Sequence, residues 1–327
     1  MGSFEGHALP GSLFIAFGLW WLVHVILDYA KYLKRQNNRG QSSNIGSWRR
    51  FPTRRLRNVP LEPGLKLAGT FAGIIAELFA IHFRLVDENN DFVKPDKFAH
   101  STMYAFFGFS GLIEIFNHYR ITHFSKEAEY IILGLAFAVE GTLFAFHLHG
   151  RDIFDVRIHT LLYIIIYLAA LVVLLEACLP RFRRELFVAR TVLVLTQGTW
   201  FWEIAYTIYG ANKWFVYADK DLTEMQLMLD TEVMTISIMW HLFGWLTVVL
   251  FCCISTNCLH KYKRIPSCCF DNGNTERGLG LLNEKLLKES EIELSDEEEI
   301  LIKRSQEETM NLTSEFLNNN SVEEDLF

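Results

Sequence analysis

The sequence lacks the short motifs that identify many soluble enzymes. Its 327 residues contain neither a Gly-rich phosphate loop, nor a CxxC pair, nor a GxSxG nucleophile elbow, and no internal repeat is visible. No feature supports nucleic-acid binding. These absences exclude the most recognisable nucleotide-binding, redox and serine-hydrolase classes, so function must be argued from composition and from individual polar residues.

A basic amino-terminal leader is also missing. The first 11 residues, MGSFEGHALPG, carry no Lys or Arg, whereas a cleavable signal peptide begins with a positively charged region. We therefore expect the first apolar segment to be retained as a helix.

Apolar residues, in contrast, are abundant and occur in blocks. Hydrophobic residues make up 50% of the sequence, including 27 Phe and 8 Trp, which is more than the core of a soluble protein of this size needs. A helix of about 20 apolar residues crosses a hydrocarbon layer of about 30 Å. The sequence therefore predicts an all-α transmembrane bundle over residues 1–265, in which the third and sixth helices are the least apolar. The seven helices are expected near 11–30, 64–83, 98–118, 128–148, 158–179, 186–209 and 232–259.

Basic residues predict the orientation of this bundle. With seven crossings, the first, third and fifth loops with their adjoining helix ends, and the few residues just after the last helix, carry 19 Lys and Arg residues, whereas the other three loops carry seven. Because positive charge stays on the cytosolic side, the amino terminus is expected to be luminal or extracellular and the carboxyl tail cytosolic. All six Cys residues then fall at cytosolic helix ends or in the tail, where thiols stay reduced, so disulfides are not expected.

Residues 266–327 differ in composition from the rest of the chain. They are acidic and polar, with too little apolar surface to fold alone, and are expected to form a disordered cytosolic tail. The stretch EEEILI resembles the acidic dileucine signal bound by clathrin adaptors. A Ser before Asp-Glu-Glu resembles an acidophilic kinase site, and a Cys pair beside KYKR suits S-acylation. The candidate sorting and modification residues are Glu297, Leu301, Ile302, Ser295, Cys268 and Cys269.

Ionisable residues lie inside or beside several of the expected spans. The densest stretch, EGTLFAFHLHGRDIFDVRIH, runs from Glu140 to His159. Ionisable groups are costly in a membrane and usually face the interior of the bundle. In the expected topology six helices send polar groups to the luminal half, whereas the cytosolic half has fewer, mainly Asp28, Glu114 and Glu176 near helix ends. We therefore expect one polar pocket that opens toward the lumen.

The residue types in this expected pocket suit a divalent cation, with zinc as the first choice. Zinc accepts His nitrogens and carboxylate oxygens as ligands, and carboxylates commonly orient such His ligands. A bound metal would activate water for hydrolysis of a membrane lipid, with a free carboxylate as the base. The candidate metal ligands are His100, His147, His149, His159 and His241. The candidate bases are Glu140 and Glu77, and the candidate orienting residues are Asp155, Gln197 and Glu203.

Three other interpretations remain open on the same residues. The groups would relay protons or bind a cation in transit, as in a proton- or cation-coupled transporter or channel, although no broken helix or inverted repeat is visible. A non-catalytic trafficking or scaffold protein would act through its tail and its lipid-facing surfaces. The polar groups would also satisfy one another and hold the bundle together without a ligand. The sequence leaves the oligomeric state open.

Several stretches in a fixed order resemble the transmembrane protein 45 family. They are GHALPG with a Leu-Trp-Trp helix, GIIAELF, AHSTMYAFFGFSG, Glu140-x6-His147-x-His149 followed by Asp155-x3-His159, QGTWFW and Trp240-His241. The resemblance implies a seven-helix multi-pass protein of the Golgi, endosomes or lysosomes, or also of the plasma membrane, with poorly defined activity. Where this chain has Glu203, the relatives carry Gln. The resemblance also places on polar positions of the family pattern His7, Glu77, His100, Glu140, His147, His149, Asp155, His159 and His241.

Overall fold

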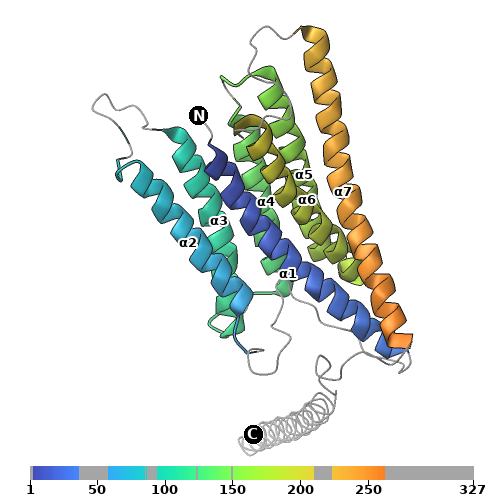
Figure 1. Cartoon of the computed structure of the whole chain (residues 1–327). Coiled ribbons are helices and arrows are strands. Elements are labelled where there is room, and N and C mark those ends of the chain that lie inside the picture. Colours follow the sequence, from blue (N-terminus) through green and yellow to red (C-terminus); the bar gives the residue numbers. More distant parts are fainter. Residues whose placement is uncertain are drawn as a thin grey trace, which may run out of the picture. The chain divides into compact units, whose positions relative to one another are not determined.

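The chain folds into a bundle of α-helices. The computed structural model describes residues 3–36, 58–84, 86, 94–122, 124–148, 150–209 and 223–261, and within them it has seven α-helices and one short 3-10 turn (Figure 1). This confirms the predicted all-α, seven-helix fold, while the predicted tail over 266–327 lies outside the described residues. The elements are α1 (Phe4–Gln36), α2 (Leu61–Ala80), α3 (Pro95–His118), α4 (Lys126–Phe146), α5 (Ile153–Cys178), η1 (Pro180–Phe182), α6 (Arg183–Tyr209) and α7 (Glu224–Lys261).

The first and last helices are longer than predicted. α1 begins at Phe4 rather than near residue 11, and the hydroxyl of Ser3 accepts the backbone N–H of Gly6 at 3.0 Å, which supports its first turn. α7 begins at Glu224 rather than near residue 232 and has 38 residues. The prediction counted apolar residues only, whereas a helix continues through polar residues as long as its backbone groups find partners.

Five helices of the described chain are long and apolar enough to cross a membrane: α1, α2, α4, α5 and α7. The other two, α3 and α6, are the ones that the sequence indicated as least apolar. In α6 this has a clear cause, because Arg190, Thr191, Thr196 and Gln197 are all fully buried. These polar side chains face other helices, so α6 can lie in a membrane without exposing them to lipid.

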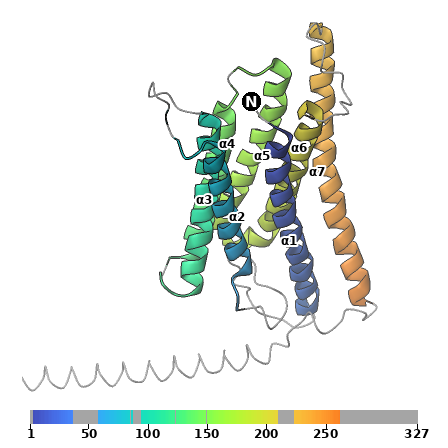
Figure 2. The ribbon, with the colours of Figure 1, turned by 60° about the vertical axis from the view of Figure 1, so that its left-hand side comes forward.

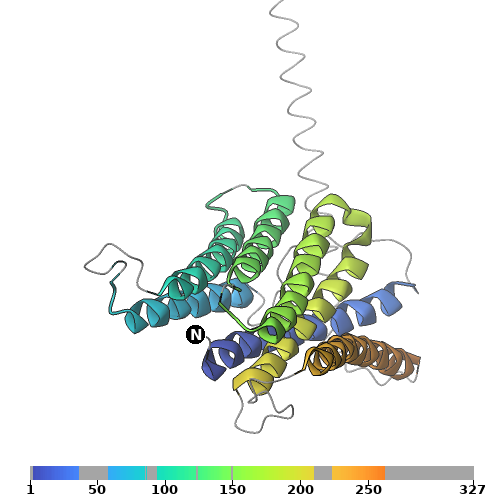
Figure 3. The ribbon, with the colours of Figure 1, turned by 90° about the horizontal axis from the view of Figure 1, so that it is seen from above.

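The helices pack in a simple order. α1 packs against α6 and α7, α5 packs against both α4 and α6, and α3 packs against α2 and α4. Figure 2 shows the helices side by side along a common direction. Viewed from above, α2 and α3 lie on one side of the bundle, and α1, α6 and α7 lie on the other (Figure 3). The α4–α5 contact therefore joins the two sides.

The closest approach between α1 and α6 depends on glycine. A Cβ atom added to Gly11 would lie 2.9 Å from the carbonyl oxygen of Gly198, and one added to Gly198 would lie 2.8 Å from the backbone nitrogen of Ile15. No side chain fits at either position without moving a helix. The contact holds the first turns of α1 against the middle of α6, about one helical turn from His7.

The two ends of the bundle are named below by the residues that they hold. The His7 end contains the first turns of α1, α3, α5 and α7 and the last turns of α2, α4 and α6. The Glu62 end is the opposite end, where α2 begins. The basic residues predict that the Glu62 end is cytosolic, and this orientation stays a prediction.

Candidate functional site at the His7 end

Two histidines far apart in the sequence meet at the His7 end. His7 lies in the first turns of α1, and His159 lies in the second turn of α5. Their Nε2 atoms are 3.1 Å apart, and their rings meet nearly edge to face, with planes at 74°. Only 6% of His7 and 1% of His159 is exposed. The pair is therefore shielded from solvent.

The other nitrogen of each ring is already bound to oxygen. His7 Nδ1 lies 3.0 Å from the carbonyl oxygen of Ser3. His159 Nδ1 lies 2.9 Å from the carbonyl oxygen of Asp155 and 2.6 Å from its Oδ1. Because these oxygens only accept, each Nδ1 must carry the hydrogen. Two neutral rings would then direct their Nε2 lone pairs at each other, so the arrangement requires a positive centre, a proton or a metal ion, between the two Nε2 atoms.

Charged and polar groups surround this pair. Arg151 Nη1 lies 3.1 and 3.0 Å from the two carboxylate oxygens of Asp155, so this one carboxylate is shared between the guanidinium and His159. The ring of Tyr209, at the end of α6, lies 5.1 Å from the ring of His7. The pair is thus enclosed by residues of α1, α5 and α6.

A second polar group joins α2, α3 and α4 at the same end. Glu77 Oε1 is 2.9 Å from His100 Nδ1, and Glu77 Oε2 is 2.8 Å from Lys97 Nζ. The ring of His100 lies 6.2 Å from that of His147, which ends α4. Burial lowers the pKa of His147 to about 4, and the positive charge of Arg151 adds to this effect. His147 is therefore neutral over the mildly acidic range.

Glu140 lies deeper in the bundle, about 10 Å from His147 along α4. It is fully buried, and its Oε1 accepts the side-chain N–H of Gln197, on α6, at 2.9 Å. Within the described residues, Glu140 Oε2, Gln197 Oε1 and Thr196 Oγ1 have no hydrogen-bond partner. Unsatisfied buried polar atoms are rare and often mark a place for water, an ion or a proton. Glu140 is therefore a second candidate for proton binding.

His241 makes a different contact, between α7 and α6. Its Nδ1 lies 2.9 Å from the hydroxyl of Thr199, which also accepts the indole N–H of Trp245 at 3.4 Å. Its Nε2 is 4.0 Å from a carboxylate oxygen of Glu203, too far for a hydrogen bond. His241 therefore fastens α7 to α6 through Thr199.

The structure thus divides the predicted site residues among four groups instead of one pocket. The first group consists of His159 and Asp155 with His7, and the second consists of Glu77 and His100 with His147. In the third, Glu140 binds Gln197. In the fourth, His241 lies near Glu203. In the described part of the chain, no group of three or more His, Cys, Asp or Glu side chains is placed to hold a metal ion. The expected single metal centre is therefore not formed by these residues, most of which bond to other partners instead. Outside the described residues lie His149, Ser295, Glu297, Leu301, Ile302, Cys268 and Cys269.

Sequence reasoning did not place His7 in the site. The expected first helix began near residue 11, so His7 was assigned to the segment before it. A signal was available, because Ser3 stands four residues before His7 and can cap a helix that contains it. The partner helix could not be found in this way, since one sequence does not say which helices meet.

The opposite end of the bundle holds a buried polar cluster that the sequence reasoning also missed. Lys66 Nζ lies 2.9 and 2.8 Å from the two carboxylate oxygens of Glu114. Glu62, one turn before Lys66 in α2, accepts the indole N–H groups of Trp20 and Trp21 at 2.8 and 2.9 Å. The prediction for this half named Asp28, Glu114 and Glu176 and did not include Glu62 or Lys66. The Glu62-x3-Lys66 spacing places both side chains on one helix face, but the expected second helix began near residue 64 and left Glu62 outside it.

Comparison with known proteins supports a membrane protein. Residues 126–259 match a family model described as "Family of unknown function (DUF716)". The chain is 25% identical over 258 residues to Transmembrane epididymal protein 1 of Rattus norvegicus, and 24% identical over 255 residues to Transmembrane epididymal protein 1A of Mus musculus. Each alignment covers 74% of this chain and 76% of the relative. Together with the apolar helices, these names identify the chain as a multi-pass membrane protein.

The matches also correct the family expected from the sequence. The matched family is DUF716 and the relatives are named transmembrane epididymal proteins, in place of the transmembrane protein 45 family. The stretches quoted for that resemblance, such as Leu-Trp-Trp and QGTWFW, are aromatic-rich pieces of membrane helices. Each is individually weak, because aromatic residues are common in such helices.

Proposed function

We propose that this multi-pass membrane protein moves protons across its membrane, alone or coupled to a solute. The observation that carries the proposal is the His7–His159 pair, whose facing Nε2 atoms require a positive centre between them. A single shared proton meets this requirement, because 3.1 Å is a normal N–H···N distance. The proton would then pass between the two rings and neighbouring groups, with Asp155 as the counter-charge.

Further protonatable groups lie at other depths of the bundle. Glu140 lies about 10 Å further in than His147 along α4, and Glu114 lies about 21 Å from His100 along α3. Glu140 has one oxygen without a hydrogen-bond partner among the described residues, and Glu114 is bound to Lys66. Carboxylates and His residues at successive depths are typical of proton relays in pumps and transporters.

A divalent cation between His7 and His159 is the second candidate. Two nitrogens that each lie 2.0–2.1 Å from a tetrahedral zinc ion would be about 3.3 Å apart, close to the observed 3.1 Å. A zinc site needs three or four ligands, however, and the described chain supplies two histidines here. Of the two bases predicted for a lipid hydrolase, Glu77 is bound to His100 and Lys97, and Glu140 lies deeper in the bundle beside Gln197. These features favour the proton.

The proposal also indicates a cellular setting. Histidine is the side chain that proteins use most often to respond to the pH of acidified compartments. The charged and titratable groups around the pair that would adjust this response are Asp155, Arg151, Tyr209 and His147. We therefore place the protein in endomembranes, namely Golgi, endosomes or lysosomes. Delivery there through clathrin adaptors that bind the tail belongs to the same proposal.

Proton movement is testable in liposomes that contain the full-length chain and a trapped pH-sensitive dye. After external acidification, wild-type liposomes should acidify inside faster than empty ones, and a metal chelator should not change the rate. The variants Glu140→Gln and His159→Asn should approach the rate of empty liposomes, because neither new side chain carries a proton. His82→Asn is the matched control, since His82 is an exposed histidine at the same end. Equal rates in wild-type and empty liposomes, or in wild type and both test variants, would contradict the proposal. Loss of flux on chelation would favour the metal.

A further inference from the structure

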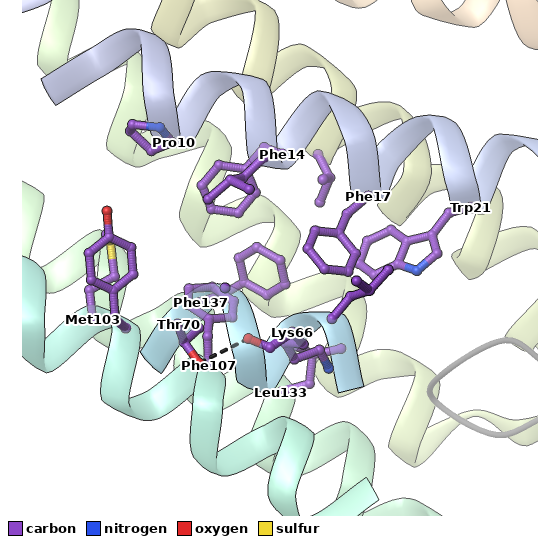
Figure 4. Close-up of a pocket in the computed structure, with 15 residues that line it drawn as sticks. Pro10, Phe14, Phe17, Trp21, Lys66, Thr70, Met103, Phe107, Leu133 and Phe137 are labelled. Carbon is purple, nitrogen blue, oxygen red and sulfur yellow. Dashed lines mark hydrogen bonds between the residues drawn. The ribbon is translucent and has the colours of Figure 1, made fainter. Parts of the chain in front are cut away.

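An apolar cleft lies between α1 and the α2–α4 side of the bundle. The space between its side chains is about 740 Å³ when its open side is included. The rings of Phe14, Phe107 and Phe137 lie against one another, with centroids 5.1 to 6.4 Å apart, and connect α1 with α3 and α4 at one part of the cleft. Figure 4 shows Phe14, Phe17 and Trp21 from α1 facing Phe107, Leu133 and Phe137 across the cleft.

Four side chains with polar atoms line the cleft, namely Tyr104 and three that already have hydrogen-bond partners. Lys66 binds Glu114 through its ammonium group. The hydroxyl of Thr70 donates to backbone carbonyl oxygens of its own helix, and the indole N–H of Trp21 donates to Glu62. A ligand in the cleft therefore meets hydrocarbon and aromatic surface, which favours an apolar chain over a polar molecule.

The mouth of the cleft lies between two helices of membrane-spanning length. Leu13 of α1 and Leu65 of α2 both line the cleft and remain 37% and 58% exposed, so they mark its rim. α1 and α2 are both apolar enough to cross a membrane. In a bilayer this mouth opens sideways into hydrocarbon, not toward water.

We propose that the cleft holds the acyl chain of one membrane lipid, which enters between α1 and α2. Moving an acyl chain from the apolar bilayer core into an apolar cleft gives little free energy by itself. Retention of the lipid therefore depends on close contact of the chain with the three Phe rings and with Met103 and Leu133. This site is separate from the His7–His159 pair and does not depend on the proposed proton movement.

Gly69 of α2 gives a precise way to fill the cleft. Gly69 lines it, and a Cβ atom added there would meet no heavy atom within 4 Å. Gly69→Leu should therefore fold normally and place its side chain where the acyl chain lies. Gly244→Leu is the matched control, because Gly244 on α7 is also open within 4 Å and does not line the cleft. Leu65→Trp, at the exposed rim, is a second way to block entry.

Lipid retention by the full-length chain tests the proposal. The purified protein is washed in detergent until loosely bound lipid is removed, and retained lipid is counted by native mass spectrometry and identified after extraction. Wild type and Gly244→Leu should retain about one lipid per chain, and Gly69→Leu and Leu65→Trp should retain about tenfold less, because the added side chains displace buried methylenes. The identified species distinguish a phospholipid from a free fatty acid. No retained lipid in wild type, or equal retention in all four proteins, would overturn the proposal.

Discussion

The buried ion pair between α5 and α6 offers the sharpest test of how the bundle is held together. Arg190 Nε lies 3.1 Å from Glu176 Oε1, and both side chains are 0% exposed. The guanidinium carbon also lies 4.5 Å from the centre of the Trp21 ring and 4.9 Å from that of Phe187. Arg190→Met keeps much of the apolar contact with these rings but removes the charge. Glu176 then loses its ion-pair partner inside the protein, and we expect a loss of about 3–5 kcal/mol of unfolding free energy.

The matched double variant separates charge from packing. Glu176→Met combined with Arg190→Met removes both charges and fills a similar volume, so stability should return to within about 1 kcal/mol of wild type or exceed it. Arg181→Met, at an exposed arginine just before α6, should change stability by less than about 0.5 kcal/mol. Reversible denaturation in detergent, followed by circular dichroism, measures wild type, these three variants and Glu176→Met alone. The reasoning fails if Arg190→Met is as stable as wild type, or if the double variant is less stable than both single variants.

Three further predictions concern stability. Glu140→Gln keeps an acceptor for Gln197 and should melt within a few degrees of wild type. Glu140→Ala leaves Gln197 unsatisfied beside a cavity and should lose about 2–4 kcal/mol of unfolding free energy. Equal melting temperatures for the two variants would contradict this prediction. Because the pKa of folded His147 is about 4, below about 6.5 for an unfolded His, the unfolded state binds the proton first as the pH falls. The contribution of neutral His147 is complete above pH 6.5 and is lost between about 6.5 and 4, so the stability of His147→Gln should fall less steeply than that of wild type over this range. Ser125→Ala removes the side-chain oxygen that accepts the N–H of Ala128 at the start of α4 and should cost about 1 kcal/mol in the same denaturation assay.

Much of the fold could be predicted because membrane helices have a simple physical requirement. Each needs a run of apolar residues of a certain length, and this gave seven helices close to those observed. α6 shows where that rule weakens. Its polar residues, such as Arg190 and Gln197, lower its hydropathy, and the structure shows that other helices cover them. Hydropathy depends only on the amino-acid composition of a segment. The free-energy cost of a polar side chain in a membrane depends on whether it faces lipid or another helix.

The arrangement of the site could be predicted only in part. The sequence identified His159, Asp155 and Glu140 as ionisable residues within or beside membrane spans, where such side chains are unfavourable unless they have a partner. It could not indicate that His159 contacts His7 or that Glu140 contacts Gln197. These contacts depend on how helices pack, and the α1–α6 contact depends on the close approach of Gly11 and Gly198. Spacing along one helix is visible in a sequence, and contact between helices is not.

The state of the His7–His159 pair is the most direct test of the central claim. Nitrogen NMR of 15N-histidine-labelled protein in lipid bilayers, with and without His7→Asn to assign the signals, reports which ring nitrogens carry hydrogen. At mildly acidic pH the account predicts hydrogen on both Nδ1 atoms and one proton shared by the two Nε2 atoms, unchanged by a chelator or by zinc. Nε2 signals typical of metal coordination, or no proton on either Nε2 atom at any pH at which the protein is folded, would contradict it.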